Sequence, residues 1–179
     1  MCCHYQLLKE DWWKFSDFPG FYERIQTDIL ESTLAPGLVL EEGRMVLRPL
    51  SFGLDIVEKK VLNARVETVA EKELFCSSYR QRKALFPCSL FFEKDERKKE
   101  HAFAGEGLLY LAGFYKQGEF ALLTRPADKV VSFHHERMPL LIPRDHAKDY
   151  LRGLFSLTSL LAMEVKIFSL DKEQQGTLF

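Results

Sequence analysis

The second residue of this 179-residue chain, Cys2, carries a thiol in an unusual position. Methionine aminopeptidase normally removes Met1 when the next residue is small, so the mature chain would begin with Cys2. A terminal cysteine holds an α-amine with a reference pKa of about 7.7–8.0 two carbons from a thiol with a reference pKa of about 8.5. The amine can form an imine with an aldehyde, and the thiol can then close on the imine carbon to give a thiazolidine ring. Cys2 is therefore either a reagent for carbonyl groups or an accidental neighbour of the start codon.

A strand-like run further along the chain places polar side chains on one face. Asn63, Arg65 and Glu67 alternate with Ala64 and Val66. Because side chains of a strand point alternately to its two faces, the three polar residues share a face. A buried strand would not carry such a face, so the run is a candidate functional surface.

Two more candidates stand next to apolar strands. Glu93 follows the apolar residues 90–92 and is either a buried acid with a raised pKa or the first solvated residue after a strand. His135 and Arg137 alternate onto one side just before another apolar run. Taken singly, Glu93 is also consistent with an ordinary strand end, and His135 with a hydrogen-bonded structural histidine.

A folded core must position these residues, and the composition provides one. Hydrophobic residues make up 46% of the chain, charged residues 28%, and the mean hydropathy is -0.17. These values exclude disordered, collagen-like and coiled-coil proteins. Short strand-like runs alternate with a few helical stretches, and no linker divides them, which predicts a single α+β domain over 1–170 and a polar tail over 171–179.

The expected elements follow from periodicity and turn residues. Helices are predicted over 20–31, where Phe21, Ile25 and Ile29 form an apolar stripe, and over 71–83, 143–152 and 154–162. Hairpins are predicted around Glu42-Gly43 and between 108–112 and 120–124. A buried strand over 84–93, broken or bent at Pro87, a solvated loop over 94–100 and a strand over 165–170 complete the prediction.

Charge and cysteine content narrow the setting. The chain has 25 Lys+Arg against 26 Asp+Glu, so its total charge indicates no polyanionic partner, although a local basic patch is compatible with it. No apolar run of about 18 residues and no signal peptide are evident, which predicts a cytoplasmic protein without a membrane span. The four cysteines, Cys2, Cys3, Cys76 and Cys88, show no CxxC spacing and fit that placement. We expect a monomer without cofactor or metal.

Together, the candidate residues and several short strings resemble one known family. The chain is similar to the SOS response-associated peptidase family over nearly its whole length. Two strings carry the resemblance together with Cys2, namely Asn63-Ala64-Arg65-Val66-Glu67-Thr68 and His135-Glu136-Arg137-Met138-Pro139. The other matches, in family order, are Ala35-Pro36, Phe52-Gly53-Leu54, Phe86-Pro87-Cys88, Phe92-Glu93 and Leu123-Thr124.

This resemblance implies a protein that recognises abasic sites in single-stranded DNA and links itself covalently to them. The expected fold has a mainly antiparallel, barrel-like sheet core with a few flanking helices. The resemblance makes Cys2 the crosslinking nucleophile, Glu93 the acid or base, and His135 an aid to proton transfer. Asn63 would hold the N-terminus. The residues that would contact DNA are His4, Phe52, Arg65, Arg82, Thr124 and Arg137, with Arg80 and Lys83 as further candidates for the positive groove.

The chain departs from the family pattern at its DNA-contacting positions. Cys3 and His4 stand where the family usually has glycine and arginine, and a histidine cannot replace the guanidinium fork. Phe52 and Lys94 stand where tryptophan is usual. Base stacking is therefore the property that these changes put in question.

Specific residues are also compatible with other functions. Mature Cys2-Cys3-His4 has the amine and histidine spacing that binds copper or nickel. A thiol peptidase that acts on itself by removing Met1, or on other proteins, would need only Cys2, Glu93 and His135. The C-terminal residues Gln175, Leu178 and Phe179 resemble peptides that dock on the replication sliding clamp, where two apolar anchors fill a preformed pocket.

Overall fold

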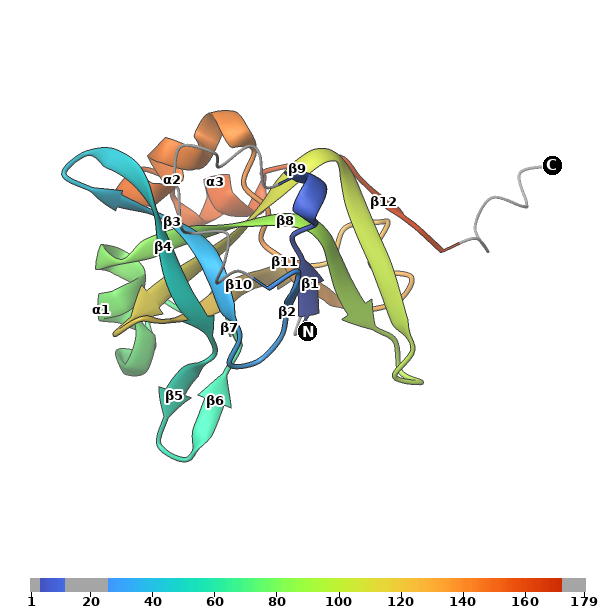
Figure 1. The fold of residues 1–179 in the computed structure, drawn as a ribbon, viewed down its shortest axis with the longest axis horizontal. Coiled ribbons are helices and arrows are strands. Elements are labelled where there is room, and N and C mark those ends of the chain that lie inside the picture. Colours follow the sequence, from blue (N-terminus) through green and yellow to red (C-terminus); the bar gives the residue numbers. More distant parts are fainter. Residues whose placement is uncertain (1–3, 12–25, 172–179) are drawn as a thin grey trace.

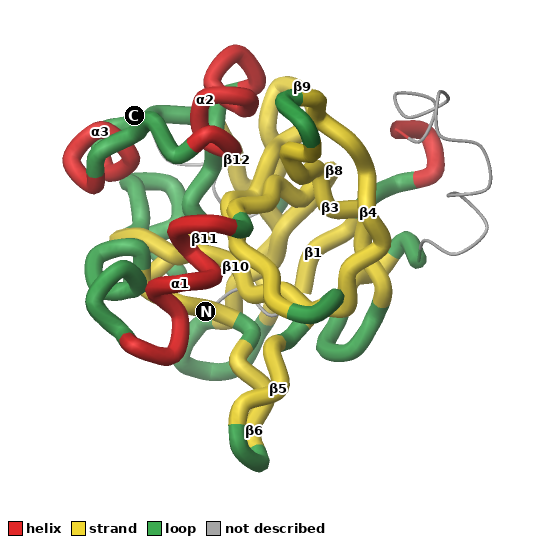
Figure 2. Tube along the Cα trace, turned by 90° about the vertical axis from the view of Figure 1, so that its left-hand side faces the viewer, coloured by secondary structure: helices red, strands yellow, loops and turns green. Residues whose placement is uncertain are grey.

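A mixed β-sheet of ten strands forms most of the protein (Figure 1). The computed structural model describes residues 4–11 and 26–171. The strands of this sheet are β1 (His4–Gln6), β2 (Asp28–Ile29), β3 (Leu34–Glu41), β4 (Arg44–Phe52), β7 (Asn63–Arg65), β8 (Lys83–Lys94), β9 (Glu100–Lys116), β10 (Glu119–Pro126), β11 (Arg137–Pro139) and β12 (Ile167–Ser169). A small hairpin of β5 (Leu54–Ile56) and β6 (Lys59–Val61) projects from the body (Figures 1 and 2).

The sheet closes on itself as a barrel. Pairing runs from β9 through β10, β4 and β3 to β8, and β8 pairs again with β9 along most of its length. Within the described residues, only the pairings of β10 with β4 and with β7 are parallel. The predicted α+β fold with a mainly antiparallel, barrel-like sheet core is therefore confirmed.

Two tight turns connect the central hairpins where the sequence predicted them. Glu42 and Gly43 join β3 to β4 with φ angles of 48° and 76°, and Gln117 and Gly118 join β9 to β10 with φ angles of 51° and 85°. Positive φ at both central residues is typical of the type I′ turn, which matches the twist of the strands it connects. The strands are longer than predicted because the barrel continues each pairing beyond the alternating run.

The α-helices of the described residues lie on one side of the barrel (Figure 2). They are α1 (Glu73–Gln81), α2 (Ala147–Arg152), which follows the 3-10 turn η3 (Arg144–His146), and α3 (Leu157–Leu161). Gly153 ends α2 in the left-handed conformation with φ 74°, as the sequence predicted. Helix α3 is shorter than the predicted 154–162 because Ser156 caps it, accepting a hydrogen bond from the Ser159 N–H at 3.1 Å.

Two predicted features of the chain are wrong. The helix over 20–31 does not extend through Ile29, which pairs with Tyr5 as part of β2, and residues 20–25 of that prediction lie outside the described residues. Pro87 does not break β8, because it keeps its register opposite Tyr110. The irregularity comes at Ser89, where the register shifts between Cys88 and Leu90. The Ser89 hydroxyl donates to Asp11 at 2.5 Å and accepts from the Leu8 N–H at 3.0 Å, so this bulge anchors the segment that follows β1.

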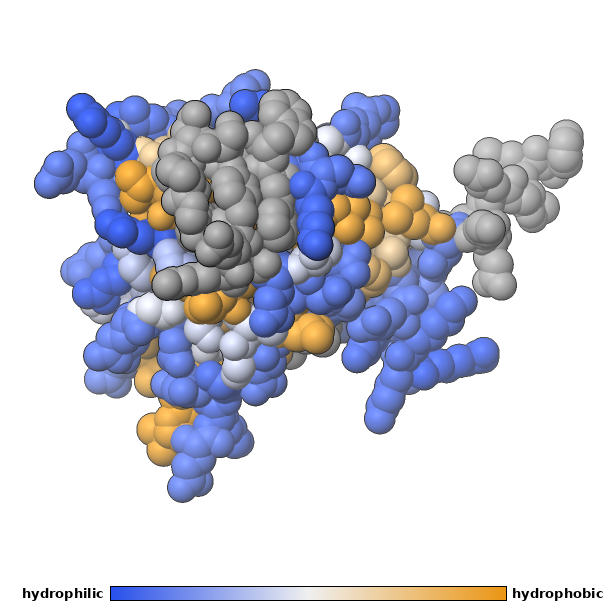
Figure 3. Space-filling model, viewed as in Figure 1, coloured by the Kyte–Doolittle hydropathy of each residue, from blue (hydrophilic) through white to orange (hydrophobic). Residues whose placement is uncertain are grey.

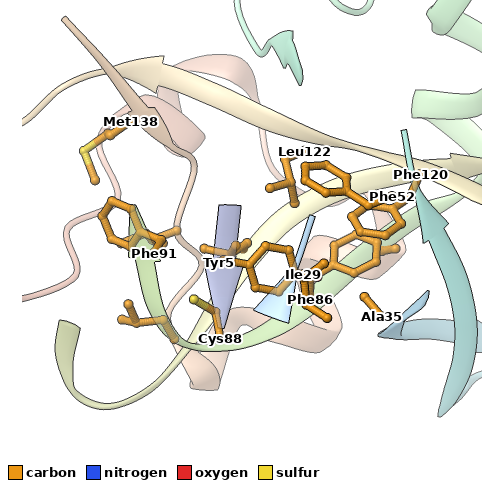
Figure 4. Close-up of a cluster of buried hydrophobic side chains, with 14 of the residues drawn as sticks. Tyr5, Ile29, Ala35, Phe52, Phe86, Cys88, Phe91, Phe120, Leu122 and Met138 are labelled. Carbon is orange, nitrogen blue, oxygen red and sulfur yellow. The ribbon is translucent and has the colours of Figure 1, made fainter. Parts of the chain in front are cut away.

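An aromatic stack fills the barrel interior (Figure 4). Phe86 stacks on Phe120 with ring centroids 3.7 Å apart, and Phe120 stacks on Phe52 at 4.9 Å. Tyr5 meets Phe52 edge-on at 6.1 Å. All four rings are fully buried, which ties β1 and β4 to the centre of the sheet.

The close approach of Phe86 to β9 explains a glycine at position 113 and gives a test of the packing. A Cβ atom on Gly113 would lie 2.6 Å from the Ala121 carbonyl oxygen and 2.8 Å from the Phe86 ring. We expect Gly113→Ala to lower the free energy of unfolding by about 1–3 kcal/mol, measured by chemical denaturation, because neither neighbour can move freely. Gly107→Ala is the matched control, since no atom lies within 4 Å of its added Cβ. Equal stability of the two variants would contradict this packing.

The surface does not identify a membrane-spanning segment. Among the described residues, no helix is long and apolar enough to cross a membrane. The face in Figure 3 is largely hydrophilic with separate apolar patches.

Gln175, Leu178 and Phe179 lie outside the described residues, so docking on a sliding clamp stays a prediction.

Candidate functional site

Strand β8 carries Glu93 into the interior near the strand's end. Its side chain is buried, with 1% of the residue exposed, even though Lys94 beside it is exposed. Of the two sequence interpretations, the buried acid is therefore the one observed. Across the sheet, Glu93 lies opposite His101 of β9, and its neighbour Phe92 lies opposite His4 of β1. The N-terminal strand thus runs directly alongside the segment that holds this carboxyl group.

His135 lies beside Glu93 and has partners for either protonation state. Its Nδ1 is 3.8 Å from Glu93 Oε2, 3.0 Å from the Arg137 backbone nitrogen and 2.9 Å from the Arg137 carbonyl oxygen. Unprotonated Nδ1 can accept from the Arg137 N–H, whereas protonated Nδ1 can donate to the Arg137 carbonyl group. The structure therefore brings the Glu93 carboxyl group and the His135 imidazole group, which come from distant parts of the sequence, next to each other.

Arg137, two residues after His135, is held by a network of hydrogen bonds. Its guanidinium group donates to both carboxylate oxygens of Glu67, at 2.5 and 2.9 Å, and to the Thr124 carbonyl and hydroxyl oxygens at 2.8 and 3.2 Å. Thr124 is fully buried and its hydroxyl group lies 3.5 Å from the Ala64 carbonyl oxygen. The network joins β7, β10 and β11, and it fixes the loop that carries His135.

Strand β7 positions Asn63 and Arg65 beside the same network. It runs parallel to β10 with Asn63 opposite Leu122 and Arg65 opposite Thr124. Asn63 is half-buried and Arg65 is exposed. Glu67 lies after the end of β7, in a turn, so the three polar residues do not form one regular strand face as predicted. Arg65 is the exposed one of these three residues.

The Glu67–Arg137 pair gives a pH-dependent contribution to stability. Hydrogen bonding from Arg137 lowers the pKa of Glu67. The contribution is present above the ordinary pKa of about 4.3 and is lost as the pH falls through the lowered folded-state value. We expect Glu67→Gln to reduce the free energy of unfolding by about 2 kcal/mol at pH 7, a value below that of fully buried pairs because Glu67 is partly exposed.

Urea unfolding as a function of pH checks this expectation. Wild type and Glu67→Gln should differ at neutral pH and converge in acid, where Glu67 is protonated in both the folded and the unfolded wild-type protein. The exposed turn residue Glu58 supplies a matched control, since Glu58→Gln should leave stability unchanged. A constant difference between wild type and Glu67→Gln from neutral to acidic pH would contradict the assigned cause.

Several residues that the resemblance assigned to DNA contact have other roles in this structure. Phe52 is buried between Tyr5 and Phe120, so its ring is inaccessible to a base. Thr124 and Arg137 are also buried, and they serve the network that orients the His135 loop. Burial disfavours these three assignments, because a strand residue inside a barrel looks the same in sequence as one on its surface.

The basic residues predicted around the first helix lie at the wrong end of β8. Arg80 belongs to α1 and Arg82 follows it, whereas Glu93 lies close to the opposite end of the strand that Lys83 begins. Lys83 donates to the Tyr79 carbonyl oxygen at 2.7 Å and lies over the Tyr79 ring, and burial lowers its pKa. These three residues are therefore not part of a groove at the candidate site.

His4 faces acidic groups instead of open solvent. Its ring stacks on Phe92 with centroids 4.2 Å apart, and its nitrogens lie 3.1 Å from Asp28 and 3.6 Å from Glu100. Hydrogen bonds from Gln6 and His4 lower the pKa of Asp28, which keeps this carboxylate charged. A phosphate would be repelled here, so these contacts disfavour the predicted contact of His4 with DNA.

The described cysteines have no features of a nucleophile. Cys88 is buried, and burial raises the pKa of its thiol well above the usual value. Cys76 is half-buried on α1, where its sulfur lies 3.6 Å from the Glu73 carbonyl oxygen. Cys2 and Cys3 lie outside the described residues, so the role predicted for Cys2 stays a prediction.

A second group of titratable residues, which the sequence did not predict, lies across the β8–β9 pair from Glu93. His101 contacts Asp171 through Nδ1 and Asp95 through Nε2, the latter at 3.1 Å. Burial lowers the pKa of His101, but the hydrogen bonds that its ring donates to Asp171 and Asp95 outweigh this effect, and the net shift of the pKa is upward. His134 stacks on His101 with centroids 3.8 Å apart. The only sequence signal was the His134-His135 pair, of which the resemblance used one member.

An open cavity of about 720 Å³ borders both groups. Its walls are the β8–β9 turn, residues 94–97, and the loop over 132–136 that carries His134 and His135. Lys94 and Arg97 contribute positive charge, while Asp95, Glu96 and Glu136 contribute negative charge. Phe133 on this loop is 75% exposed and supplies an apolar surface at the rim.

A closed, mainly antiparallel barrel defines the class of this protein, with a buried carboxyl group and a half-buried imidazole group close to its N-terminal strand. It is a small β-barrel domain in which Glu93 and His135 lie 3.8 Å apart near the end of β8. The SOS response associated peptidase (SRAP) family matches residues 26–167, and the chain belongs to this family. The predicted family is thus confirmed, and at family level this membership supports a role connected with DNA damage.

Solved bacterial structures share the fold. A protein from Bordetella bronchiseptica is 18% identical with a TM-score of 0.75, covering 95% of this chain and 100% of its own. A protein from Bacteroides thetaiotaomicron is 16% identical with a TM-score of 0.71, covering 96% and 93%. A phage-related protein from Bordetella bronchiseptica is 18% identical with a TM-score of 0.62, covering 94% and 93%. No curated protein matches the sequence.

Proposed function

We propose that this protein captures abasic sites in single-stranded DNA through a covalent bond to Cys2. The observation that carries the proposal is the position of Glu93 and His135 beside β1. His4 lies opposite Phe92, the residue next to Glu93, and it is two residues after Cys2 in the sequence. Two residues of extended chain reach at most about 7 Å. We therefore infer that the amine and thiol of Cys2 come within reach of the acid–base pair.

The proposed reaction joins the C1′ aldehyde of the abasic deoxyribose to both groups of Cys2. The sugar is mostly a closed hemiacetal, so a proton must reach the ring oxygen before the aldehyde is exposed. The Cys2 amine then adds to the carbonyl carbon, and the resulting carbinolamine loses one water to give an imine. The thiol sulfur adds to the imine carbon while its proton passes to the nitrogen, which closes the thiazolidine ring. Nucleophilic capture of this kind makes the intermediate the product.

Glu93 and His135 supply the proton transfers that these steps require. A buried carboxyl group can act as general acid when sheltered from bulk water, and an imidazole group beside it can return the proton. Glu93 and His135 are close enough, at 3.8 Å, for exchange through a small local movement or one water. Removal of Met1 is a precondition, because an acylated Cys2 has no free amine.

A single strand fits this site better than a duplex because its sugar can reach a residue at the strand ends of the barrel. Exposed cations close to the pair are Arg65 on β7 and Arg97 in the β8–β9 turn, and Lys94 lies 3.6 Å from Glu100. The exposed ring of Phe133 offers a surface on which a base can stack. In this proposal, these residues take the DNA-binding role that the sequence analysis gave to the basic residues around Arg82.

A denaturing gel with an oligonucleotide that carries one abasic site tests the proposal. We expect a covalent protein–DNA band with single-stranded DNA and much less with duplex DNA. If Arg65 and Arg97 each neutralise one phosphate, raising the salt from 50 to 200 mM should lower the apparent affinity about sevenfold. Arg65→Ala should flatten this salt dependence, whereas Lys59→Ala on the β5–β6 hairpin should not. The absence of any band with the single strand would refute the function.

A further inference from the structure

The second titratable group has the composition of a metal site. One nitrogen each of His101 and His134 and one carboxylate oxygen of Asp171 lie within 4.8 Å of one another. They come from β9, from the loop over 128–136 and from the second residue after the end of β12, so only the fold brings them together. We propose that His101, His134 and Asp171 bind a divalent transition-metal ion with the preferences of Zn²⁺.

The surroundings of His101 follow the pattern of a metal-binding imidazole. Its Nδ1 points to Asp171, while its Nε2 lies 3.1 Å from Asp95 Oδ2. Metal-bound histidines almost always donate their second ring N–H to a carboxylate or carbonyl oxygen, which fixes the ring and raises its basicity. Asp95 is itself held by the backbone N–H groups of Arg97 and Lys99, at 2.8 and 3.0 Å. Asp95 therefore orients His101 without being a ligand.

His134 supplies the second nitrogen. Its Nε2 is buried and, among the described residues, has no hydrogen-bond partner, which is an unfavourable arrangement for a polar atom unless a ligand binds there. Its ring is fixed between His101, whose centroid is 3.8 Å away, and the edge of Phe103 at 5.8 Å. Burial and the neighbouring His101 lower its pKa, so the neutral form that binds metals is favoured.

The geometry requires only small side-chain movements. Ligand atoms about 2.0–2.2 Å from a tetrahedral Zn²⁺ are about 3.3 Å from one another, so the three donors must converge by an ångström or so and His134 must tilt from its stacked position. The ion takes the place of the proton that Asp171 and His101 share, and this proton is released to solvent. Three protein ligands leave a fourth position for water, as in open zinc sites.

The proposed site is distinct from the N-terminal site that Cys2-Cys3-His4 suggested. His101 faces Glu93 across the β8–β9 pair, whereas His4 lies opposite Phe92, and residues that alternate along β8 point to opposite faces. Neither Cys2 nor His135 is a ligand. Metal binding can therefore be tested without reference to DNA capture, and either proposal can fail alone.

Titration of the EDTA-treated full-length protein tests the site. Calorimetry with Zn²⁺ should show one ion per chain, and Co²⁺ should develop the visible absorption bands of a low-symmetry site. His134→Ala should weaken binding more than tenfold, and Asp95→Asn by about 10- to 100-fold, as for other orienting carboxylates. His146→Ala is the matched control, since His146 packs against Phe155 and is not one of the proposed ligands. This variant should bind the metal like wild type.

Three results would overturn the inference. The first is the absence of Zn²⁺ and Co²⁺ binding, which would leave His101 as a protonated bridge between two carboxylates. The second is an affinity that His134→Ala and Asp95→Asn both leave unchanged while circular dichroism shows that the variants fold. The third is loss of all binding in a Cys2→Ala, Cys3→Ala double variant, which would move the ion to the N-terminus.

Discussion

Cys2→Ala is expected to abolish the heat-stable crosslink to an abasic single strand, with a loss of at least about 100-fold on a denaturing gel. The reason is chemical, because alanine keeps the terminal amine but removes the sulfur that closes the ring. An imine can still form with the variant, and borohydride should trap it as a stable amine. Restoration of a band only after reduction would show that the amine reacts first and that the thiol makes the bond durable.

Cys3→Ala provides the matched control, since it removes a neighbouring thiol without changing the terminal residue. It should crosslink like wild type. Mass spectrometry must show that Met1 is absent from each preparation, because the retained methionine would block the amine for a trivial reason. A heat-stable band of wild-type intensity from Cys2→Ala would mean that another residue captures the sugar, and the described Cys76 and Cys88 would then have to be tested.

Glu93→Gln is expected to slow crosslinking by about 10² to 10⁴-fold, the range that positioned general acids and bases contribute. Glutamine keeps the size and much of the hydrogen-bonding capacity of the buried side chain but cannot deliver a proton. A single-turnover time course on denaturing gels measures the rate. Binding of an undamaged single strand, measured by fluorescence anisotropy, should stay within about twofold of wild type.

Glu93→Asp distinguishes a catalytic role from a structural one. It retains the acid but moves it by about one methylene group, so it should restore part of the rate that Glu93→Gln loses. Both variants must unfold close to the wild-type temperature for this comparison to hold. If glutamine supports the wild-type rate, Glu93 does not transfer the proton and His135 would have to act with a different partner.

The sequence determined the family and the local elements of this protein. The strings around Asn63 and His135 identified the family, since they combine polar residues in an order that packing alone does not require. Turns such as Glu42-Gly43 and the Gly153 helix end were predictable because their backbone conformations need particular residue types. Helix 71–83 was predictable from its own pattern, and α1 lies within it.

Tertiary structure alone decided which candidate side chains are exposed to solvent and which contact one another. Phe52 and Arg137 looked like DNA contacts by position, but barrel closure buries the first in an aromatic stack and pairs the second with Glu67. His101 and Asp171 are 70 residues apart, and no local pattern relates them. The physical reason is that alternation in a strand fixes which residues share a face, while the side of a closed sheet that becomes the interior depends on pairings between distant segments.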